Sequence, residues 1–388
     1  MGRRRTFVLF FTAIMLLATA CGSTTSNTFN TSFYDTPSPI PSGPPGTVIR
    51  FETMVAPFPD SQAWRVLYTS TGIEGEPIVV SGMVFAPAGP APAGGRPVVS
   101  WAHPTTGIED QCAPSRSPKP YDDVQGLSEF LGLGWVVVAT DYQGLGTDGM
   151  HPYLVGASEA QGTIDIVRAA RSLESETSAS TRYFVFGHSQ GGQAALFAGQ
   201  MASTYAPELQ LLGVAAAAPA GLLVPLFQAD KDTAAGAVLG SYAIVSWSDV
   251  FGYEESSVVK SMLSNRVRAV SNKCVVGGSR LSDVEIGIND LILKGRMWSA
   301  DPATTPPWSQ QFAVNTAGQS PISVPLLLTQ GTADKIITPS TTAELTATYV
   351  ALGNKQATEQ VMPGVDHMKA GKESVPYVVP FFQRILRQ

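Results

Sequence analysis

Short apolar runs rich in β-branched residues alternate along this chain with longer, helix-like segments. Such an alternation predicts an α/β fold, in which a mostly parallel sheet is covered by helices on both faces. Eight strands are expected, at Trp64–Thr69, Ile78–Phe85, Val98–Ala102, Trp135–Thr140, Tyr183–Phe186, Gly213–Ala217, Pro325–Thr329 and Thr358–Val361. Five helices are expected around them, at Gln125–Leu133, Glu159–Leu173, Gln190–Met201, Ser340–Leu352 and Val375–Leu386.

The fifth expected strand runs into a serine, Ser189, with glycine at both two-residue offsets. A serine hydroxyl becomes an effective nucleophile when a tight, strained turn raises it to where a histidine can reach it. Gly187 and Gly191 leave the room that strand and helix need for close approach on such a turn. No other serine in the chain has this flanking pattern, and an Ala-rich helix follows it. The segment therefore predicts the nucleophile elbow of an α/β-hydrolase.

The partners of the nucleophile follow it in this fold in the order acid, then histidine. His367 is the one histidine after Ser189, and it lies in the loop after the last expected strand. Asp334 lies in a turn just after the seventh expected strand and is the expected acid. Asp366 is the alternative acid, but as the immediate neighbour of His367 it would have difficulty reaching the Nδ1 atom of that ring. We predict a Ser189, Asp334 and His367 triad.

Two backbone N–H groups are needed to hold the oxyanion of a tetrahedral intermediate. The N–H of Gln190, at the start of the helix after the nucleophile, is one expected donor. The other is expected from the loop after the third strand, where Pro104 has no N–H to give. Thr105 is the expected second donor, and Thr106 is the alternative.

A long insertion, from about residue 221 to 309, separates the sixth and seventh expected strands. A structureless loop of this length would be unusual inside a domain, and the segment contains several apolar, helix-like patches. Because the sixth strand ends at the catalytic edge of such sheets, we interpret the insertion as a helical cap over the active site. A packed subdomain with no part in substrate access is the alternative.

The first twenty residues have the arginine-rich start and the apolar stretch of an export signal, and that stretch is too short to span a bilayer as a helix. Small residues then precede Cys21, a pattern that resembles the lipobox of bacterial lipoproteins. We expect Cys21 to be acylated and to hold an exported protein at the membrane; release of a soluble, secreted protein is the alternative. Residues 22–46 are rich in Ser, Thr, Pro and Gly, which predicts a flexible tether, and residues 47–388 form the expected hydrolase domain.

Charged residues make up 14% of the chain, the net charge is −6, and no Lys/Arg run lies outside the export signal. This composition lacks the basic patch of a nucleic-acid-binding protein. With Cys21 assigned to the lipid, Cys112 and Cys274 remain, and in an exported protein they are expected to pair. Two buried free thiols are the alternative. No Cys/His cluster has metal-ligand spacing, so neither a metal nor a cofactor is expected.

Three segments together resemble the secretory lipase family, typified by yeast lipase A and its exported actinobacterial relatives. They are Gly187–Gly192, His103–Gly107 with Cys112 close behind, and Asp141–Gly146 leading to His151-Pro152-Tyr153. The resemblance covers the chain from about Val66 to its end. It implies an α/β-hydrolase with a large cap after strand six that acts on triacylglycerols and other carboxylic esters. It also implies that the family's nucleophile, acid and base fall on Ser189, Asp334 and His367.

Together these features predict a serine hydrolase, a triacylglycerol lipase or esterase of lipid catabolism that works through an acyl-enzyme. An acyltransferase or a peptidase on the same scaffold is one alternative, because this fold hosts many reactions. A non-catalytic, lipid-binding surface lipoprotein is another, although it would require a missing triad residue and none is missing. An apolar cap favours long acyl chains, but such caps also cover sites for small esters.

Overall fold

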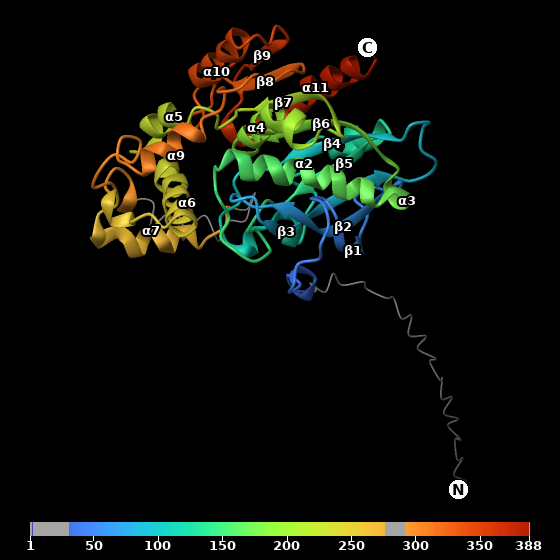
Figure 1. Cartoon of the computed structure of the whole chain (residues 1–388), viewed down its shortest axis with the longest axis horizontal. Helices are drawn as coiled ribbons and strands as arrows, with labels where there is room; N and C mark the ends of the chain where they lie inside the picture. The colour runs from blue at the N-terminus through green and yellow to red at the C-terminus, as the bar shows by residue number, and fades with distance from the viewer. Residues whose placement is uncertain (1, 3–30, 276–291, 388) are drawn as a thin grey trace. The chain divides into compact units, whose positions relative to one another are not determined.

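One sheet runs through the folded chain, with the first strands at one edge and the last strands at the other (Figure 1). The computed structural model describes residues 2, 31–275 and 292–387. In these residues the sheet has nine strands in the order β1-β2-β3-β5-β4-β6-β7-β8-β9. The strands are β1 (Val48–Met54), β2 (Ser61–Thr71), β3 (Pro77–Pro87), β4 (Arg96–Ala102), β5 (Val136–Thr140), β6 (Ala179–His188), β7 (Gln210–Ala217), β8 (Leu326–Gly331) and β9 (Ala357–Met362).

The direction of strand pairing changes at β5. The pairs β1–β2, β2–β3 and β3–β5 are antiparallel, and every neighbouring pair from β5 to β9 is parallel. The mostly parallel α/β fold is therefore confirmed, and all eight expected strands are present. The sequence pattern does not predict the ninth strand, β1. This edge strand mixes charged residues such as Arg50 and Glu52 with apolar ones, so it has no apolar run.

Helices cover both faces of the sheet. Successive strand residues point to opposite faces, so Val98 belongs to the apolar cluster that contains residues of α2, α4 and α10, while its neighbour Val99 belongs to the cluster that contains residues of α1 and α11. On the second face Phe184 of β6 stacks on Phe382 of α11, with ring centroids 4.3 Å apart. These helices, with the short α3, are α1 (Leu127–Gly132), α2 (Gly156–Ser172), α3 (Glu174–Thr177), α4 (Gln190–Tyr205), α10 (Pro339–Ala351) and α11 (His367–Leu386).

The last helix begins earlier than its sequence pattern predicts. The expected start is Val375, but α11 begins at His367 and continues through Pro376 and Pro380. The side chain of Asp366 caps this start by accepting a hydrogen bond from the N–H of Lys369. His367 therefore lies in the first turn of a helix rather than in a free loop.

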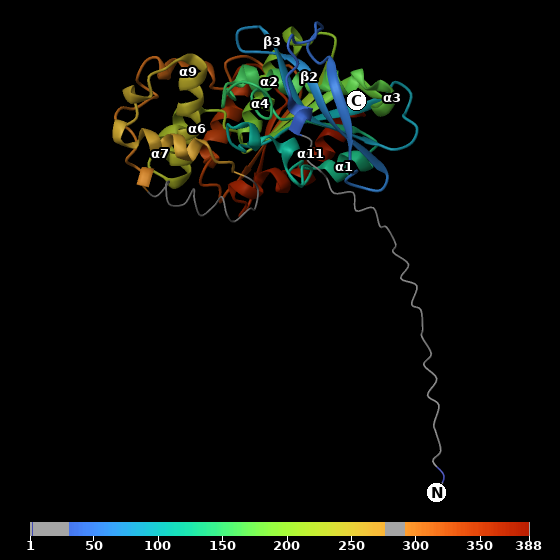
Figure 2. The ribbon, with the colours of Figure 1, turned by 90° about the horizontal axis from the view of Figure 1, so that it is seen from below.

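The insertion between β7 and β8 is helical in its described part, as expected. Its helices are α5 (Leu223–Asp230), α6 (Ala234–Phe251), α7 (Ser264–Ser271) and α9 (Trp308–Val314), with 3₁₀ turns at Glu255–Ser257 and Ser261–Leu263. They share an apolar cluster that includes Trp247 and Trp308. In both views α6, α7 and α9 lie together at one side of the sheet (Figures 1 and 2).

A disulfide ties this insertion to the core. Cys112 ends a 3₁₀ turn after β4, at Asp110–Cys112, and is bonded to Cys274, just after α7. A second 3₁₀ turn, Pro114–Arg116, follows directly. The structure thus contains the pairing that the cysteine count predicts, and the bond closes a loop with a sequence separation of 162 residues.

The folded unit begins well before the expected end of the tether. Thr31–Tyr34 form a 3₁₀ turn, Phe33 and Tyr34 are buried, and the Tyr34 hydroxyl hydrogen-bonds the Ser115 hydroxyl at 2.8 Å. Within the tether predicted over 22–46, Phe33 and Tyr34 are thus packed into the folded unit, whereas residues 35–45 form no helix or strand. Cys21 and nearly all of the export signal lie outside the described residues.

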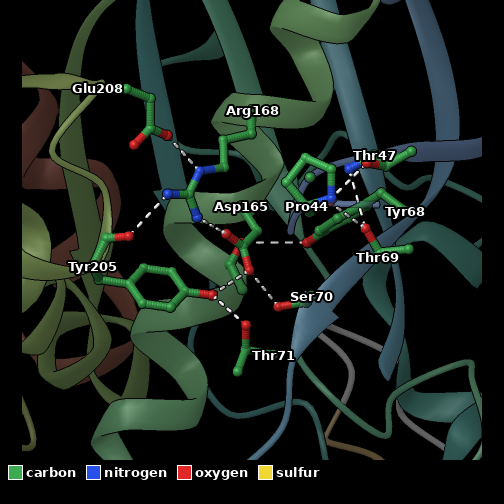
Figure 3. Close-up of polar contacts among 12 residues, drawn as sticks. Pro44, Thr47, Tyr68, Thr69, Ser70, Thr71, Asp165, Arg168, Tyr205 and Glu208 are labelled. Atoms are coloured by element: carbon green, nitrogen blue, oxygen red, sulfur yellow. Dashed lines mark hydrogen bonds and ion pairs between the residues drawn. The ribbon is translucent and has the colours of Figure 1, made fainter. Parts of the chain in front are cut away.

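The end of this docked segment packs beside a buried polar network (Figure 3). Thr69 of β2 donates a hydrogen bond to the carbonyl oxygen of Pro44 at 2.9 Å. In the network, Asp165 of α2 is fully buried and accepts hydrogen bonds from Ser70 at 2.6 Å and Tyr205 at 2.8 Å. Arg168 pairs with Asp165 at 2.6 Å and so links α2, β2 and the end of α4.

We predict a large difference between two substitutions in this network. Arg168→Met leaves the buried Asp165 carboxylate without its cation and should lower the free energy of unfolding by about 3–5 kcal/mol. Glu208→Gln removes the half-exposed partner of the same Arg168 and should cost about 1 kcal/mol or less. Urea unfolding of both variants measures this. If both variants lose the same small amount of unfolding free energy, the buried Asp165 carboxylate does not need Arg168 to remain stable.

Candidate active site

Ser189 stands at the sharp turn between β6 and α4, with φ 57° and ψ −117°. A positive φ is strained for a residue with a side chain and is found where surrounding contacts enforce it. A Cβ on Gly187 would overlap the carbonyl oxygen of Gly191, and one on Gly191 would overlap the carbonyl oxygen of Ala102. The close approach of strand and helix therefore excludes any larger residue at both glycine positions.

The structure brings the three expected triad residues into one chain of hydrogen bonds. Nε2 of His367 lies 2.9 Å from Oγ of Ser189, and Nδ1 of His367 lies 2.8 Å from Oδ2 of Asp334. Asp366, the alternative acid, instead bonds Nζ of Lys369 at 2.8 Å. The geometry thus places Asp334, and not Asp366, behind the histidine.

Asp334 is held by more than His367. Its Oδ1 atom accepts hydrogen bonds from the backbone N–H groups of Ile336 and Ile337, both at 2.9 Å. Burial alone would raise the pKa of Asp334, but the hydrogen bonds from His367 and the two N–H groups outweigh it and lower that pKa. An ionised Asp334 keeps the proton of His367 on Nδ1, so Nε2 faces Ser189 as an acceptor.

The ring of His188, the residue before Ser189, packs beside the ring of His367. Its ring centroid lies 5.0 Å from that of His367. Burial lowers the pKa of His188 to about 3, so this ring is neutral at physiological pH. It therefore does not compete with His367 for the proton of Ser189.

The two expected oxyanion donors emerge at the same edge of the sheet. Gln190 is the first residue of α4, so its N–H has no acceptor within its own helix. Thr105 lies in the loop after β4, and β4 pairs with β6 so that Ala102 lies opposite Gly187. The Thr105 hydroxyl is fixed by the hydroxyl of Tyr153 at 2.8 Å.

A buried polar group lies behind Gln190 that the sequence analysis does not single out. Nε2 of Gln190 lies 2.7 Å from Oε1 of Glu159 and 2.9 Å from Nε2 of His151. Oε1 of Glu159 also accepts the N–H of Leu154 at 2.9 Å, and Nδ1 of His151 bonds the carbonyl oxygen of Gln143 at 2.8 Å. The one available signal is the His151-Pro152-Tyr153 motif, which by itself gives no role.

This group is uncharged at neutral pH. Burial raises the pKa of Glu159 to about 8 and lowers the pKa of His151 to about 3. A neutral hydrogen-bonded network thus holds the side chain of Gln190 against α2.

An apolar pocket opens beside Ser189, with a volume of about 90 Å³. Its walls come from the insertion and from core loops, so both parts of the chain shape it. The insertion contributes Leu223, Leu226, Phe227, Asp230, Lys231, Gly236, Leu239, Gly240, Ala243, Trp247 and Phe312, and the core contributes Tyr153, Leu154, Gln190, Ala220, Ile336 and Ile337.

Known proteins share this architecture. The esterase LipA of Xanthomonas oryzae, described as degrading rice cell walls, superimposes with a TM-score of 0.70 over 87% of this chain and 96% of its own, at 24% identity. Candida antarctica lipase A does so with a TM-score of 0.72 over 91% and 85%, at 18% identity. The fold is that of an α/β-hydrolase.

Sequence comparison points to one family within that fold. The family model described as secretory lipase matches residues 121–266. A probable inactive lipase of Mycobacterium tuberculosis is 28% identical over 211 residues, which are 50% of this chain and 46% of that protein. The chain spans about half the length of the curated relatives it matches. The resemblance to secretory lipases predicted from the three motifs is confirmed.

The neutral state of Glu159 predicts how stability depends on pH. The folded chain keeps a proton on Glu159 up to about pH 8, whereas the unfolded chain loses it near the ordinary pKa of 4.5. Between these values the folded state binds more protons, so this residue lowers stability as pH rises. The stability of Glu159→Gln relative to wild type should therefore increase by about 1.4 kcal/mol per pH unit between about pH 5 and pH 8. Urea unfolding at several pH values measures this, and a flat difference would mean that Glu159 is ionised.

Proposed function

We propose that this protein is a serine hydrolase that cleaves carboxylic esters, as a triacylglycerol lipase or an esterase. The observation that carries the proposal is the hydrogen-bonded chain from Ser189 through His367 to Asp334, with Ser189 lining an apolar pocket. The similarity to secretory lipases and the fold shared with known esterases and lipases support it.

In the proposed reaction His367 accepts the proton of Ser189 through Nε2 while Oγ attacks the ester carbonyl carbon. The N–H groups of Gln190 and Thr105 donate to the oxyanion that forms. His367 then gives its proton to the leaving alcohol, and an acyl-enzyme remains. Water, deprotonated by His367, attacks the acyl-enzyme and releases the acid. Asp334 holds the imidazole tautomer and stabilises the imidazolium in both halves.

The pocket supports an acyl group as the part of the substrate that enters the protein. Its walls carry aliphatic and aromatic side chains from both the insertion and the core. Burying each CH₂ of an acyl chain there would contribute about 0.8 kcal/mol to binding. On this proposal the insertion is a cap that forms part of the substrate site, and triglycerides or smaller esters are its ligands.

A catalytically silent lipid-binding protein is less well supported. The relative from Mycobacterium tuberculosis is described as probably inactive, but in this chain all three triad side chains are present and hydrogen-bonded. In the part of the chain that the structure describes, no specific contact favours an acyltransferase or a peptidase.

We also propose that the protein is exported and held at the membrane through Cys21. Its similarity to secretory lipases supports export, and a disulfide between Cys112 and Cys274 suits an oxidising compartment. In a bacterial host, Cys21→Ser should stop incorporation of a radiolabelled fatty acid and release the protein from the membrane fraction. Unchanged labelling would place the lipid elsewhere.

Ester hydrolysis tests the activity directly. Wild type should hydrolyse p-nitrophenyl esters, and Ser189→Ala should lose turnover by roughly 10⁴–10⁶-fold. A series of acyl chains from two to eighteen carbons separates a lipase, with activity rising toward long chains, from an esterase confined to short ones. A wild type as inert as Ser189→Ala would contradict the proposed function.

Two neighbouring acids offer a matched test of the triad. Asp334→Asn should lower kcat by about 10⁴-fold, because an amide no longer fixes the productive tautomer of His367. Asp366→Asn should leave kcat near that of wild type, since asparagine caps a helix as well as aspartate does. Steady-state kinetics on one ester decide the matter. Comparable losses in the two variants would remove Asp334 from its proposed role.

A further inference from the structure

One residue of the apolar pocket does not suit its surroundings. Asp230 lines the pocket together with Ser189, and only 8% of its surface is exposed. Within the described part of the chain, its carboxyl oxygens make no hydrogen bond and no ion pair. Its neighbour Lys231 also lines the pocket, but the Lys231 ammonium bonds Gln228 at 2.6 Å and lies 3.7 Å from Asp301.

In the protein without substrate, Asp230 is less favourable for stability than an apolar residue would be at the same position. Asp230 is the last residue of α5, where the negative end of the helix dipole disfavours a carboxylate. Burial raises the pKa of Asp230 to about 6; the charge of Asp334 raises it further, while His367 acts to lower it. A desolvated carboxyl group without a hydrogen bond is unfavourable, and an apolar residue would fill the same space at lower cost.

Asp230 and Ser189 line the same pocket, so this carboxyl group lies on the substrate side of the triad. A mostly buried carboxyl group that no group in residues 31–275 or 292–387 satisfies, in the pocket that Ser189 also lines, is suited to a donor on the substrate. The donor is better neutral than cationic, because His367 carries a positive charge in the transition state and would repel an ammonium group. A hydroxyl group meets both conditions.

We propose that Asp230 is a polar subsite that binds a free hydroxyl group of the ester substrate, and that it gives this enzyme a preference for hydroxyl-bearing esters such as partial glycerides. The proposal rests on the proposed ester hydrolysis. Asp230 accepts a hydrogen bond from the substrate hydroxyl while Ser189 attacks the ester carbonyl. The remaining pocket walls bind the apolar part of the same substrate.

A pair of esters that differ only in their hydroxyl groups tests this subsite. Glycerol monobutyrate and propyl butyrate share the acyl chain and the length of the alcohol. For wild type, kcat/KM should be higher for glycerol monobutyrate. Asp230→Leu should lower the ratio of the two kcat/KM values by about 10–100-fold, the effect of losing one hydrogen bond to a charged group. Because Asp230 lines the substrate pocket, its replacement can also change kcat/KM for propyl butyrate, so the readout is the ratio of the two values and not either value alone.

Two further variants complete the design. Asp230→Asn keeps an acceptor oxygen and should retain part of the preference. Asp232→Asn changes an exposed acid two residues away and should leave the ratio at the wild-type value. Asp230→Leu should also unfold at a temperature equal to or above that of wild type, because it removes a buried carboxyl group, and this confirms that the variant is folded.

The outcomes separate a failed subsite from a failed function. An unchanged ratio in folded Asp230→Leu overturns the subsite. If that unchanged ratio arises from equal losses on both esters, Asp230 acts on His367 and not on the substrate hydroxyl. A wild-type preference for the choline ester of butyric acid over glycerol monobutyrate would show that the site binds a cation and not a neutral hydroxyl group, which also contradicts the proposal. If wild type cleaves neither butyrate ester and none of the p-nitrophenyl esters from two to eighteen carbons, the proposed function itself fails.

Discussion

The contact between the elbow and the strand beside it is the constraint from which the site is built. The helix start at Gly191 lies against the backbone of Ala102, and this distance leaves no space for a Cβ. β4, β6 and α4 are thereby drawn together at one point, and Ser189 is forced into its strained conformation there. Because β4 supplies the oxyanion loop and α4 supplies Gln190, the same contact sets the separation of the groups that would surround a reacting carbonyl.

Buried acids serve three different purposes in this protein. Asp165 is balanced by a cation and two hydroxyl groups, and it fastens α2 to its neighbours. Glu159, on the same helix, is kept neutral and holds the side chain next to the nucleophile. Asp334 is the one whose hydrogen bonds outweigh burial, so it stays ionised. Burial is the largest cause that raises the pKa of Glu159, whereas the hydrogen bonds of Asp334 outweigh burial and lower its pKa.

The sequence predicts the fold because the core strands are short, apolar and separated by recognisable helices. It predicts Ser189 and His367 from a local motif and from the lack of another histidine after it. It does not predict β1, whose polar edge has no apolar run, or the start of α11, which two prolines obscure. The sequence also does not predict the roles of Glu159 and Asp230. Each is an ordinary acid in a helix, and its importance arises only when distant segments fold around it.

The disulfide links the insertion to the loop that carries Thr105. Cys112 follows closely on the loop that carries Thr105, and residues after Cys274 are joined to the same loop, where the N–H of Val275 bonds the carbonyl oxygen of Thr106 at 2.8 Å. One covalent and one hydrogen-bonded link thus couple this end of the insertion to the backbone that faces the nucleophile. A change in the position of this end of the insertion would therefore also move the loop that carries Thr105.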